Sequence, residues 1–206
     1  MSTGDRYAGT ISHDEMDDYC DVRPLWLSPD LCVCGTVSSE PHFPLLSGPF
    51  NGNSRVRSAA GLIERAVTQV GMLAQTSGLT LIQQAPLDLP SFSGDEDILR
   101  RTLVNLLGNA IKFTPSGGTI TASAEMVDQG MLFAIRDTGE GIPPEAFERI
   151  FEQFGQVESR IAGRKMSTGL GLTFCKLAVN VHGGRLWLES QPGKGSIFYF
   201  TIPHEE

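Results

Sequence analysis

Residues 105–112 read Asn-Leu-Leu-Gly-Asn-Ala-Ile-Lys, and this stretch guides the interpretation of the whole chain. Asn105, Asn109 and Lys112 stand at positions i, i+4 and i+7, so a helix places two amides and an ammonium on one face. The opposite face predicts a core stripe, made of Leu103, Leu106, Leu107 and Ala110. An amide oxygen suits a hard cation such as Mg²⁺, and an ammonium suits a phosphate. The polar stripe is consistent with one wall of a nucleotide site. It is equally consistent with an ordinary solvated helix face.

Composition indicates an ordinary globular protein with an acidic N-terminal segment. Of 206 residues, 40% are hydrophobic and 19% charged, and the net charge is −8. Residues 1–54 hold eight acidic and two basic side chains, so the rest of the chain is nearly neutral, and nucleic-acid binding is not expected. No apolar run approaches the roughly 20 residues of a membrane span, and the N-terminus lacks a signal-peptide pattern. We therefore expect a cytoplasmic protein with no membrane segment in this chain.

The four cysteines show no metal-binding or redox spacing. Cys20, Cys32, Cys34 and Cys175 contain no C-x-x-C pair, and few histidines accompany them. We interpret all four as reduced thiols and Cys175 as a small core residue of a helix.

The chain divides into two parts of different character. Prolines and glycines interrupt residues 1–54 repeatedly, which predicts a poorly ordered acidic segment with at most short strands or one helical turn. Regular patterns then continue over residues 57–203. They predict a helix ending at Gly78, a strand over 79–83, a helix capped by Asp95, and a hairpin of strands 119–127 and 131–136 with its turn at Gln129-Gly130. A short helix near 145–150, a helix over 170–181 and a closing hairpin over 185–202 follow. This order predicts a two-layer α/β sandwich, with a mixed sheet packed on about three helices.

A second motif, Asp137-Thr-Gly-Glu-Gly-Ile-Pro, stands where a predicted strand ends. An Asp at this place is able to accept a hydrogen bond from an exocyclic amine such as N6 of adenine. Gly139 and Gly141 allow the backbone to approach a flat base. An ordinary tight turn capped by its Asp explains the same residues.

A third motif, Ser167-Thr-Gly-Leu-Gly-Leu, leads directly into a predicted helix. Free N–H groups at a helix N-terminus beside glycines form an anion site, although a glycine hinge before a core helix has the same pattern. Phe151-Glu-Gln-Phe154 and a loop with Arg160, Arg164 and Lys165 lie between the second and third motifs. The basic side chains of this loop are able to close over phosphates. An ordinary solvated loop has the same composition.

The order Asn-x-x-x-Asn-x-x-Lys, D-x-G-x-G, Phe-x-x-Phe, G-L-G-L resembles the N, G1, F and G2 boxes of the histidine-kinase catalytic and ATP-binding domain. That family belongs to the gyrase, heat-shock-90, kinase and MutL superfamily. The resemblance covers residues of about 57–203 and implies a Bergerat-type ATP-binding fold. Its departure from the family pattern is at Met166 and Ser167, where kinases often carry two glycines.

The resemblance also implies a role for each motif. Asn109, assisted by Asn105, would hold Mg²⁺, Lys112 would meet a phosphate, and Asp137 would bind adenine N6. Phe151 and Phe154 would pack the base of the ATP lid. The full set of implied cofactor-binding residues is Asn105, Asn109, Lys112, Asp137, Gly139, Gly141, Ile142, Phe154, Lys165, Thr168, Gly169, Leu170, Gly171 and Leu172. No residue is assigned as catalytic.

Position 105 favours a kinase over a hydrolase. The resemblance indicates that ATPase branches of the superfamily carry a Glu there as general base, and an Asn takes no proton at neutral pH. The expected function is therefore a two-component sensor histidine kinase domain that binds Mg²⁺-ATP and donates the γ-phosphate. Two alternatives stay open, an ATP hydrolase of the same superfamily and a non-enzymatic nucleotide-binding module.

The implied partners are a dimerisation domain that carries the acceptor histidine and a response regulator receiver domain. Ser12-His13-Asp14 matches only the start of an acceptor box, and prolines over residues 14–54 exclude a long helical hairpin. We therefore expect the acceptor histidine on another chain or on further sequence, and we interpret His182 as structural.

Overall fold

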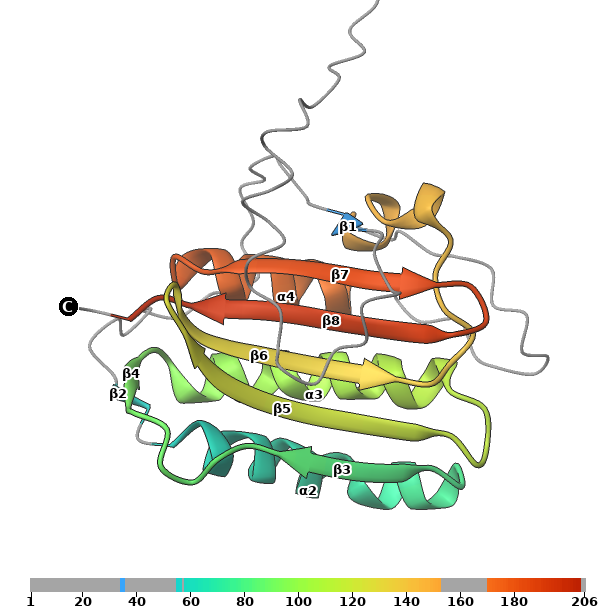
Figure 1. Ribbon diagram of the computed structural model, residues 1–206, viewed down its shortest axis with the longest axis horizontal. Helices are drawn as coiled ribbons and strands as arrows, with labels where there is room; N and C mark the ends of the chain where they lie inside the picture. The colour runs from blue at the N-terminus through green and yellow to red at the C-terminus, as the bar shows by residue number, and fades with distance from the viewer. Residues whose placement is uncertain (1–33, 36–54, 57, 153–169, 205–206) are drawn as a thin grey trace, which may run out of the picture.

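The computed structural model describes residues 34–35, 55–56, 58–152 and 170–204, and a six-stranded sheet is its centre (Figure 1). The strand order is β1-β7-β8-β6-β5-β3. The strands are β1 Cys34–Gly35, β3 Thr80–Gln84, β5 Thr119–Val127, β6 Gly130–Asp137, β7 Arg185–Gln191 and β8 Gly195–Ile202. Only β3 and β5 pair in parallel, and the other neighbours are antiparallel. The predicted mixed sheet is thus confirmed.

Three α-helices within the described part of the chain pack on one face of the sheet. They are α2 Ala59–Thr76, α3 Glu96–Phe113 and α4 Gly171–Val181, and all lie behind the sheet in Figure 1. This is the predicted two-layer α/β sandwich. The predicted short helix near 145–150 consists of two 3₁₀ turns, η1 Pro144–Ala146 and η2 Arg149–Phe151. The sequence patterns did not predict the small pair of strands β2 Arg55–Val56 and β4 Phe92–Ser93.

A side-chain cap defines where α3 begins. An oxygen of Asp95 accepts hydrogen bonds from the N–H groups of Asp97 and Ile98, both at 3.0 Å, which confirms the predicted cap. The backbone N–H of Asp95 donates to Nε2 of His182 at 2.9 Å, and Nδ1 of His182 lies 2.6 Å from the carbonyl of Ala178. His182 therefore joins the start of α3 to the end of α4, in keeping with the structural role expected for it.

The first hairpin differs from its prediction by one residue. Val127 pairs with Gly130, so the turn residues are Asp128 and Gln129 rather than Gln129 and Gly130. Gly130 has φ +123°, and a Cβ atom there would lie 2.2 Å from the carbonyl oxygen of Ile202. Close approach of the neighbouring strand, rather than a turn, therefore requires this glycine.

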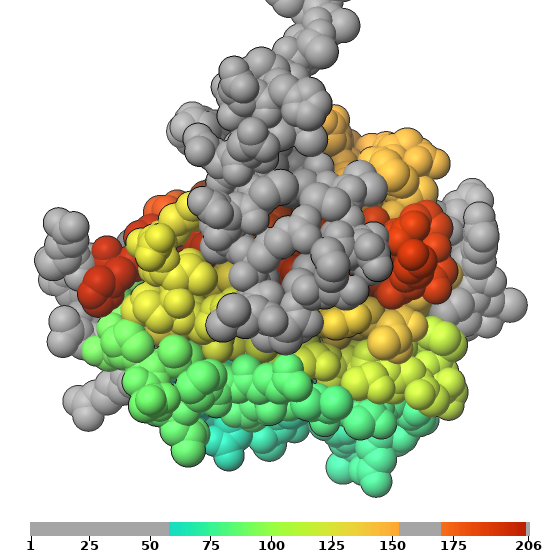
Figure 2. Space-filling view, viewed as in Figure 1, coloured from blue at the N-terminus to red at the C-terminus, as the bar shows by residue number. Residues whose placement is uncertain are grey.

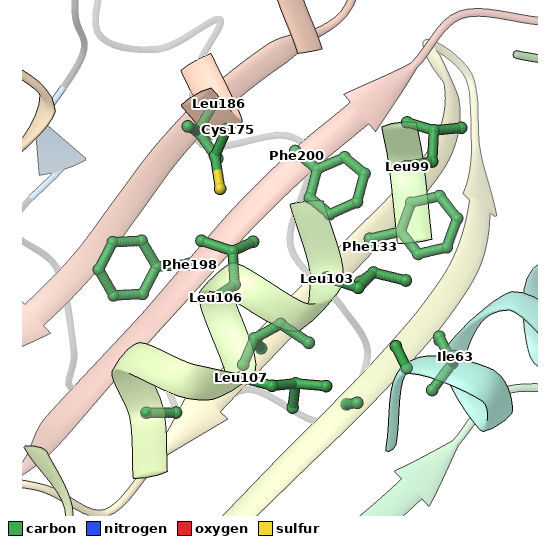
Figure 3. Close-up of a cluster of buried hydrophobic side chains, with 14 of the residues drawn as sticks. Ile63, Leu99, Leu103, Leu106, Leu107, Phe133, Cys175, Leu186, Phe198 and Phe200 are labelled. Carbon is green, nitrogen blue, oxygen red and sulfur yellow. The ribbon is translucent and has the colours of Figure 1, made fainter. Parts of the chain in front are cut away.

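The core lies between the sheet and the helices (Figure 3). The predicted apolar stripe of α3, made of Leu103, Leu106, Leu107 and Ala110, is buried, and Leu99 of the same helix is buried with it. Phe133 of β6 and Phe200 of β8 stack with ring centroids 4.7 Å apart. Cys175 of α4 is a free, fully buried thiol, as expected.

Most of the predicted N-terminal segment, including Cys20 and Cys32, lies outside the described residues, and its poor order stays a prediction. Its described residues form β1, which pairs with β7 at an edge of the sheet. None of the helices that the structure describes is both long and apolar enough to cross a membrane.

The buried stripe of α3 predicts a large loss of stability on truncation. We expect Leu106→Ala to lower the free energy of unfolding by about 2–5 kcal/mol, because it removes a fully buried side chain and leaves a cavity. The matched control is Met72→Ala on α2, where the side chain is 78% exposed, with an expected change within about 0.5 kcal/mol. Urea denaturation of both variants checks this; equal losses would contradict the packing.

Candidate functional site

The polar residues of α3 lie together on the side opposite its buried leucines. Asn105, Asn109 and Lys112 are each partly exposed, as their spacing predicted. The N-terminus of α4 approaches this face, since a methyl group placed on Gly171 would lie 3.8 Å from Oδ1 of Asn105. Lys112 Nζ lies 4.9 Å from the ring centroid of Phe113. The structure therefore brings the first motif and the end of the third motif side by side.

The buried thiol of Cys175 joins α4 to α3 close to the first of these amides. Sγ of Cys175 donates to the carbonyl of Thr102 at 3.6 Å. Burial raises the pKa of Cys175, and the nearby Asn105 side chain opposes that rise only in part, so the thiol stays protonated.

Asp137 ends β6 as a buried carboxylate. It is 5% exposed, and Oδ1 accepts a hydrogen bond from the N–H of Gly139 at 2.7 Å. Burial raises its pKa from 3.8 to about 6, the N–H groups of Gly139 and Ser196 act in the opposite direction, and Glu140 adds to the rise. At neutral pH the group is mostly ionised, and it is then an acceptor for an N–H donor.

Both glycines of the second motif lie against other backbone. A Cβ atom on Gly139 would lie 2.5 Å from the carbonyl oxygen of Phe113, at the end of α3. Gly141 has φ +69°, and a Cβ atom there would lie 2.1 Å from the carbonyl oxygen of Gln191. The N–H of Glu140 donates to the same Phe113 carbonyl at 3.2 Å. The Asp137 turn is therefore fixed to the C-terminal end of α3.

Two serines of the closing hairpin support this turn, and the sequence patterns missed them. Oγ of Ser190 accepts from the N–H of Ile142 at 2.7 Å, donates to the carbonyl of Gly195 at 3.0 Å and lies 2.9 Å from Oγ of Ser196. The register pairs Asp137 with Ser196. Small polar residues beside a Gly-rich turn are too common to indicate this contact; only the pairing of β6 with β8 reveals it.

The remaining predicted residues divide between described and undescribed parts of the chain. Leu170, Gly171 and Leu172 begin α4, and Ile142 packs partly buried against the core. Phe151 is buried, with its ring edge-on to Phe198 at 6.4 Å. Phe154, Lys165, Thr168 and Gly169 lie outside the described residues, as do Arg160, Arg164, Met166 and Ser167. Their expected roles stay predictions.

The close approach at Gly139 predicts a specific penalty for a methyl group. Gly139→Ala should lower the free energy of unfolding by about 1–3 kcal/mol, because its Cβ would collide with backbone and with Asp137. Gly71→Ala in α2, where no heavy atom lies within 4 Å, is the matched control and should raise it by about 0.5–1 kcal/mol. Chemical denaturation of both variants measures these changes. Stabilisation by Gly139→Ala would contradict the close approach of Gly139 to the Phe113 carbonyl.

The raised pKa of Asp137 predicts how stability depends on pH. The folded protein binds this proton more tightly than the unfolded chain, so ionisation costs stability as pH rises from about 4 to about 6. The loss is about 3 kcal/mol, and the Asp137→Asn variant should lack it. Equal pH slopes of unfolding free energy in parent and variant over this window would show that burial does not perturb Asp137.

Comparison with known proteins agrees with this geometry. The family model for histidine kinase-, DNA gyrase B- and HSP90-like ATPases matches residues 94–206, just over half of the chain. The adaptive-response sensory kinase SasA of Rippkaea orientalis is 44% identical over 126 residues, covering 61% of this chain and 32% of the relative. SasA of Crocosphaera subtropica is 42% identical over 143 residues, covering 69% of this chain and 37% of the relative. The chain thus spans about a third of the length of these curated relatives.

Solved structures give the same result. Full-length ShkA in complex with AMPPNP has a TM-score of 0.63 at 31% identity, covering 72% of this chain and 30% of ShkA. The catalytic domain of histidine kinase ThkA has a TM-score of 0.63 at 25% identity, covering 73% of this chain and 97% of that domain. By its motifs, its fold and these matches, the chain belongs to the histidine kinase-, DNA gyrase B- and HSP90-like ATPase family and contains a histidine-kinase ATP-binding domain.

Proposed function

We propose that this chain holds Mg²⁺-ATP and donates the γ-phosphate to a histidine on a separate dimerisation domain, from which a response regulator receives it. SasA is a sensory kinase by name, and the ShkA structure contains a nucleotide analogue. These relatives support the proposal, as does the absence of an acceptor-histidine box resembling the family pattern. A cytoplasmic location is part of the same proposal.

Asn105 is the observation that favours transfer over hydrolysis. An amide at this place has no basic site to activate water, whereas a Glu would have one. Oδ1 of Asn105 lies near Gly171, where the third motif ends. Nucleotide held here is therefore protected from rapid hydrolysis by the lack of a general base.

The donor atoms of the site fit Mg²⁺ only together with phosphate and water. Among the described residues no cluster of three or more His, Cys, Asp or Glu side chains suits a metal ion. The amide oxygens of Asn105 and Asn109 would hold the ion, a hard cation that usually keeps several waters. Bound Mg²⁺ neutralises phosphate charge, and Lys112 on the same helix face would do so as well.

Asp137 would select the base. Its carboxylate is fixed by Gly139 and Ser196, and Gly141 keeps side-chain atoms away from the turn. An ionised acceptor in a buried site favours a base with an exocyclic amine, such as adenine, over one with a carbonyl at that place.

Nucleotide binding is tested by thermal unfolding. ATP with Mg²⁺ should raise the melting temperature of the parent chain by several degrees, since a ligand at about 100 times its Kd adds about 2.7 kcal/mol. Asp137→Asn and Asn109→Asp should each abolish the rise. Asn180→Asp, an exposed residue of α4, is the matched control and should retain it. No ATP-dependent rise in the parent chain would overturn the proposal.

Phosphoryl transfer is tested with labelled ATP. The chain alone should acquire no acid-labile phosphate and should hydrolyse ATP negligibly, whereas a supplied histidine-kinase dimerisation domain should become labelled. Rapid hydrolysis without transfer would favour the ATP hydrolase. Binding with neither activity would favour the non-enzymatic module. Label on the chain that is lost in His13→Ala would identify His13 as the acceptor.

A further inference from the structure

A row of polar residues interrupts the core face at one end of the sheet. Phe198 of β8 pairs with Leu188 of β7, and both side chains belong to the core between sheet and helices. Two residues further toward the β7–β8 turn, Asp137, Ser196 and Ser190 stand in register, and all three are buried. Because side chains alternate with a period of two, this polar row points to the same face as the core residues. Figure 2 shows the opposite face of the sheet, with β3 and β5 in the lower part of the visible surface.

Ser190 is the centre of the hydrogen bonds in the polar row. Its Oγ accepts from the N–H of Ile142 at 2.7 Å and donates to the carbonyl oxygen of Gly195 at 3.0 Å. A hydroxyl has a single hydrogen and a carbonyl oxygen only accepts, so this hydrogen is directed at Gly195. The 2.9 Å contact between the Oγ atoms of Ser190 and Ser196 therefore requires Ser196 to donate. Ser190 thus makes one hydrogen bond as donor and two as acceptor.

This arrangement determines which groups Ser196 has left for a ligand. Its hydroxyl hydrogen is directed at Ser190, so the remaining capacity of its Oγ is that of an acceptor. Asp137 stands directly opposite Ser196 in the register, and its carboxylate is an acceptor when ionised. Side chains of directly opposite residues are close enough to contact the same group. Two adjacent acceptors suit the two hydrogens of an exocyclic amine, and they repel a carbonyl oxygen.

Ser190 also holds the far end of the Asp137 turn. The middle of the turn is fixed at Glu140, whose carbonyl accepts the N–H of Gly193 at 2.7 Å. The end of the turn is fixed at Ile142, whose N–H donates to Ser190, 48 residues further along the chain. One buried hydroxyl therefore connects the turn to β7 and orients the hydroxyl beside Asp137.

We propose that Ser190 is a positioning residue that strengthens the preference of the candidate nucleotide site for a 6-amino purine over a 6-oxo purine. The proposal rests on the proposed binding of ATP at Asp137. Ser190 itself touches no ligand in this scheme, and it acts through the Ser196 hydroxyl and the Ile142 N–H. Without Ser190, the hydroxyl of Ser196 loses its acceptor and is able to turn and donate to a carbonyl oxygen of the base.

The test compares ATP with ITP, which carries a carbonyl oxygen where ATP carries the 6-amino group. Calorimetric titration of the full chain with each nucleotide and Mg²⁺, well below the melting temperature, gives the ratio of the two Kd values. The parent should bind ATP at least about tenfold more tightly than ITP. Ser190→Ala should reduce this ratio about threefold to tenfold, the range expected for one hydrogen bond.

Ser123→Ala is the matched control. Ser123 of β5 is also a buried serine, 5% exposed, and its Oγ donates to the carbonyl of Ala134 at 3.5 Å, in the middle of the β5–β6 pairing. Loss of its hydroxyl should lower the melting temperature but leave the ATP-to-ITP ratio at the parent value. An unchanged ratio in Ser190→Ala, or an equal fall in Ser123→Ala, would overturn the proposal.

A double-mutant cycle tests whether Ser190 acts through Ser196. Ser196→Ala should reduce the ratio, and adding Ser190→Ala should reduce it little further, because both changes remove the same oriented hydroxyl. Fully additive effects would overturn this route. If Ser190→Ala does not fold, Ser190→Cys keeps a weak donor and acceptor of similar size and should give an intermediate ratio. A parent chain that binds no ATP overturns the proposed function as well, whereas ATP binding with a ratio insensitive to Ser190 overturns only this inference.

Discussion

Burial of one side of α3 against the sheet determines which side chains lie on the opposite, polar side of this helix. Leu99, Leu103, Leu106 and Leu107 are completely removed from water, and each contributes about 1.5–3 kcal/mol of transfer free energy. Any rotation of α3 about its axis would expose these leucines and bury Asn105, Asn109 and Lys112. The hydrophobic contact therefore fixes the position of the polar groups, and the rest of the site is assembled around this helix.

Both ends of α3 are held by contacts from distant parts of the chain. At its start, Asp95 caps the helix and binds His182 at the end of α4. At its end, the Phe113 carbonyl accepts the N–H of Glu140. The second of these contacts brings the Asp137 turn to the helix, and Gly139 is required because a side chain would prevent this approach. Backbone contacts thus join α3 to the end of β6 in the candidate site.

Asp137 illustrates a conflict between stability and binding. Removing a carboxylate from water destabilises the unliganded fold, as its raised pKa records. The same removal from water makes the ionised group a stronger acceptor for an N–H donor. Two backbone N–H groups, from Gly139 and Ser196, hold the charge and offset part of the cost. A ligand N–H would offset more of it.

The sequence alone determined the three helices and the longer strands, because apolar periodicity, the Asp95 cap and the glycine breaks are local signals. It also predicted a set of nucleotide-binding motifs, since their order resembles that of one family. Only the tertiary structure decided which motifs touch. The approach of Gly171 to Asn105, the pairing of Asp137 with Ser196 and the hydrogen bond from Ile142 to Ser190 each join residues far apart in the chain. Sheet register and helix packing create such contacts, and no local pattern encodes them.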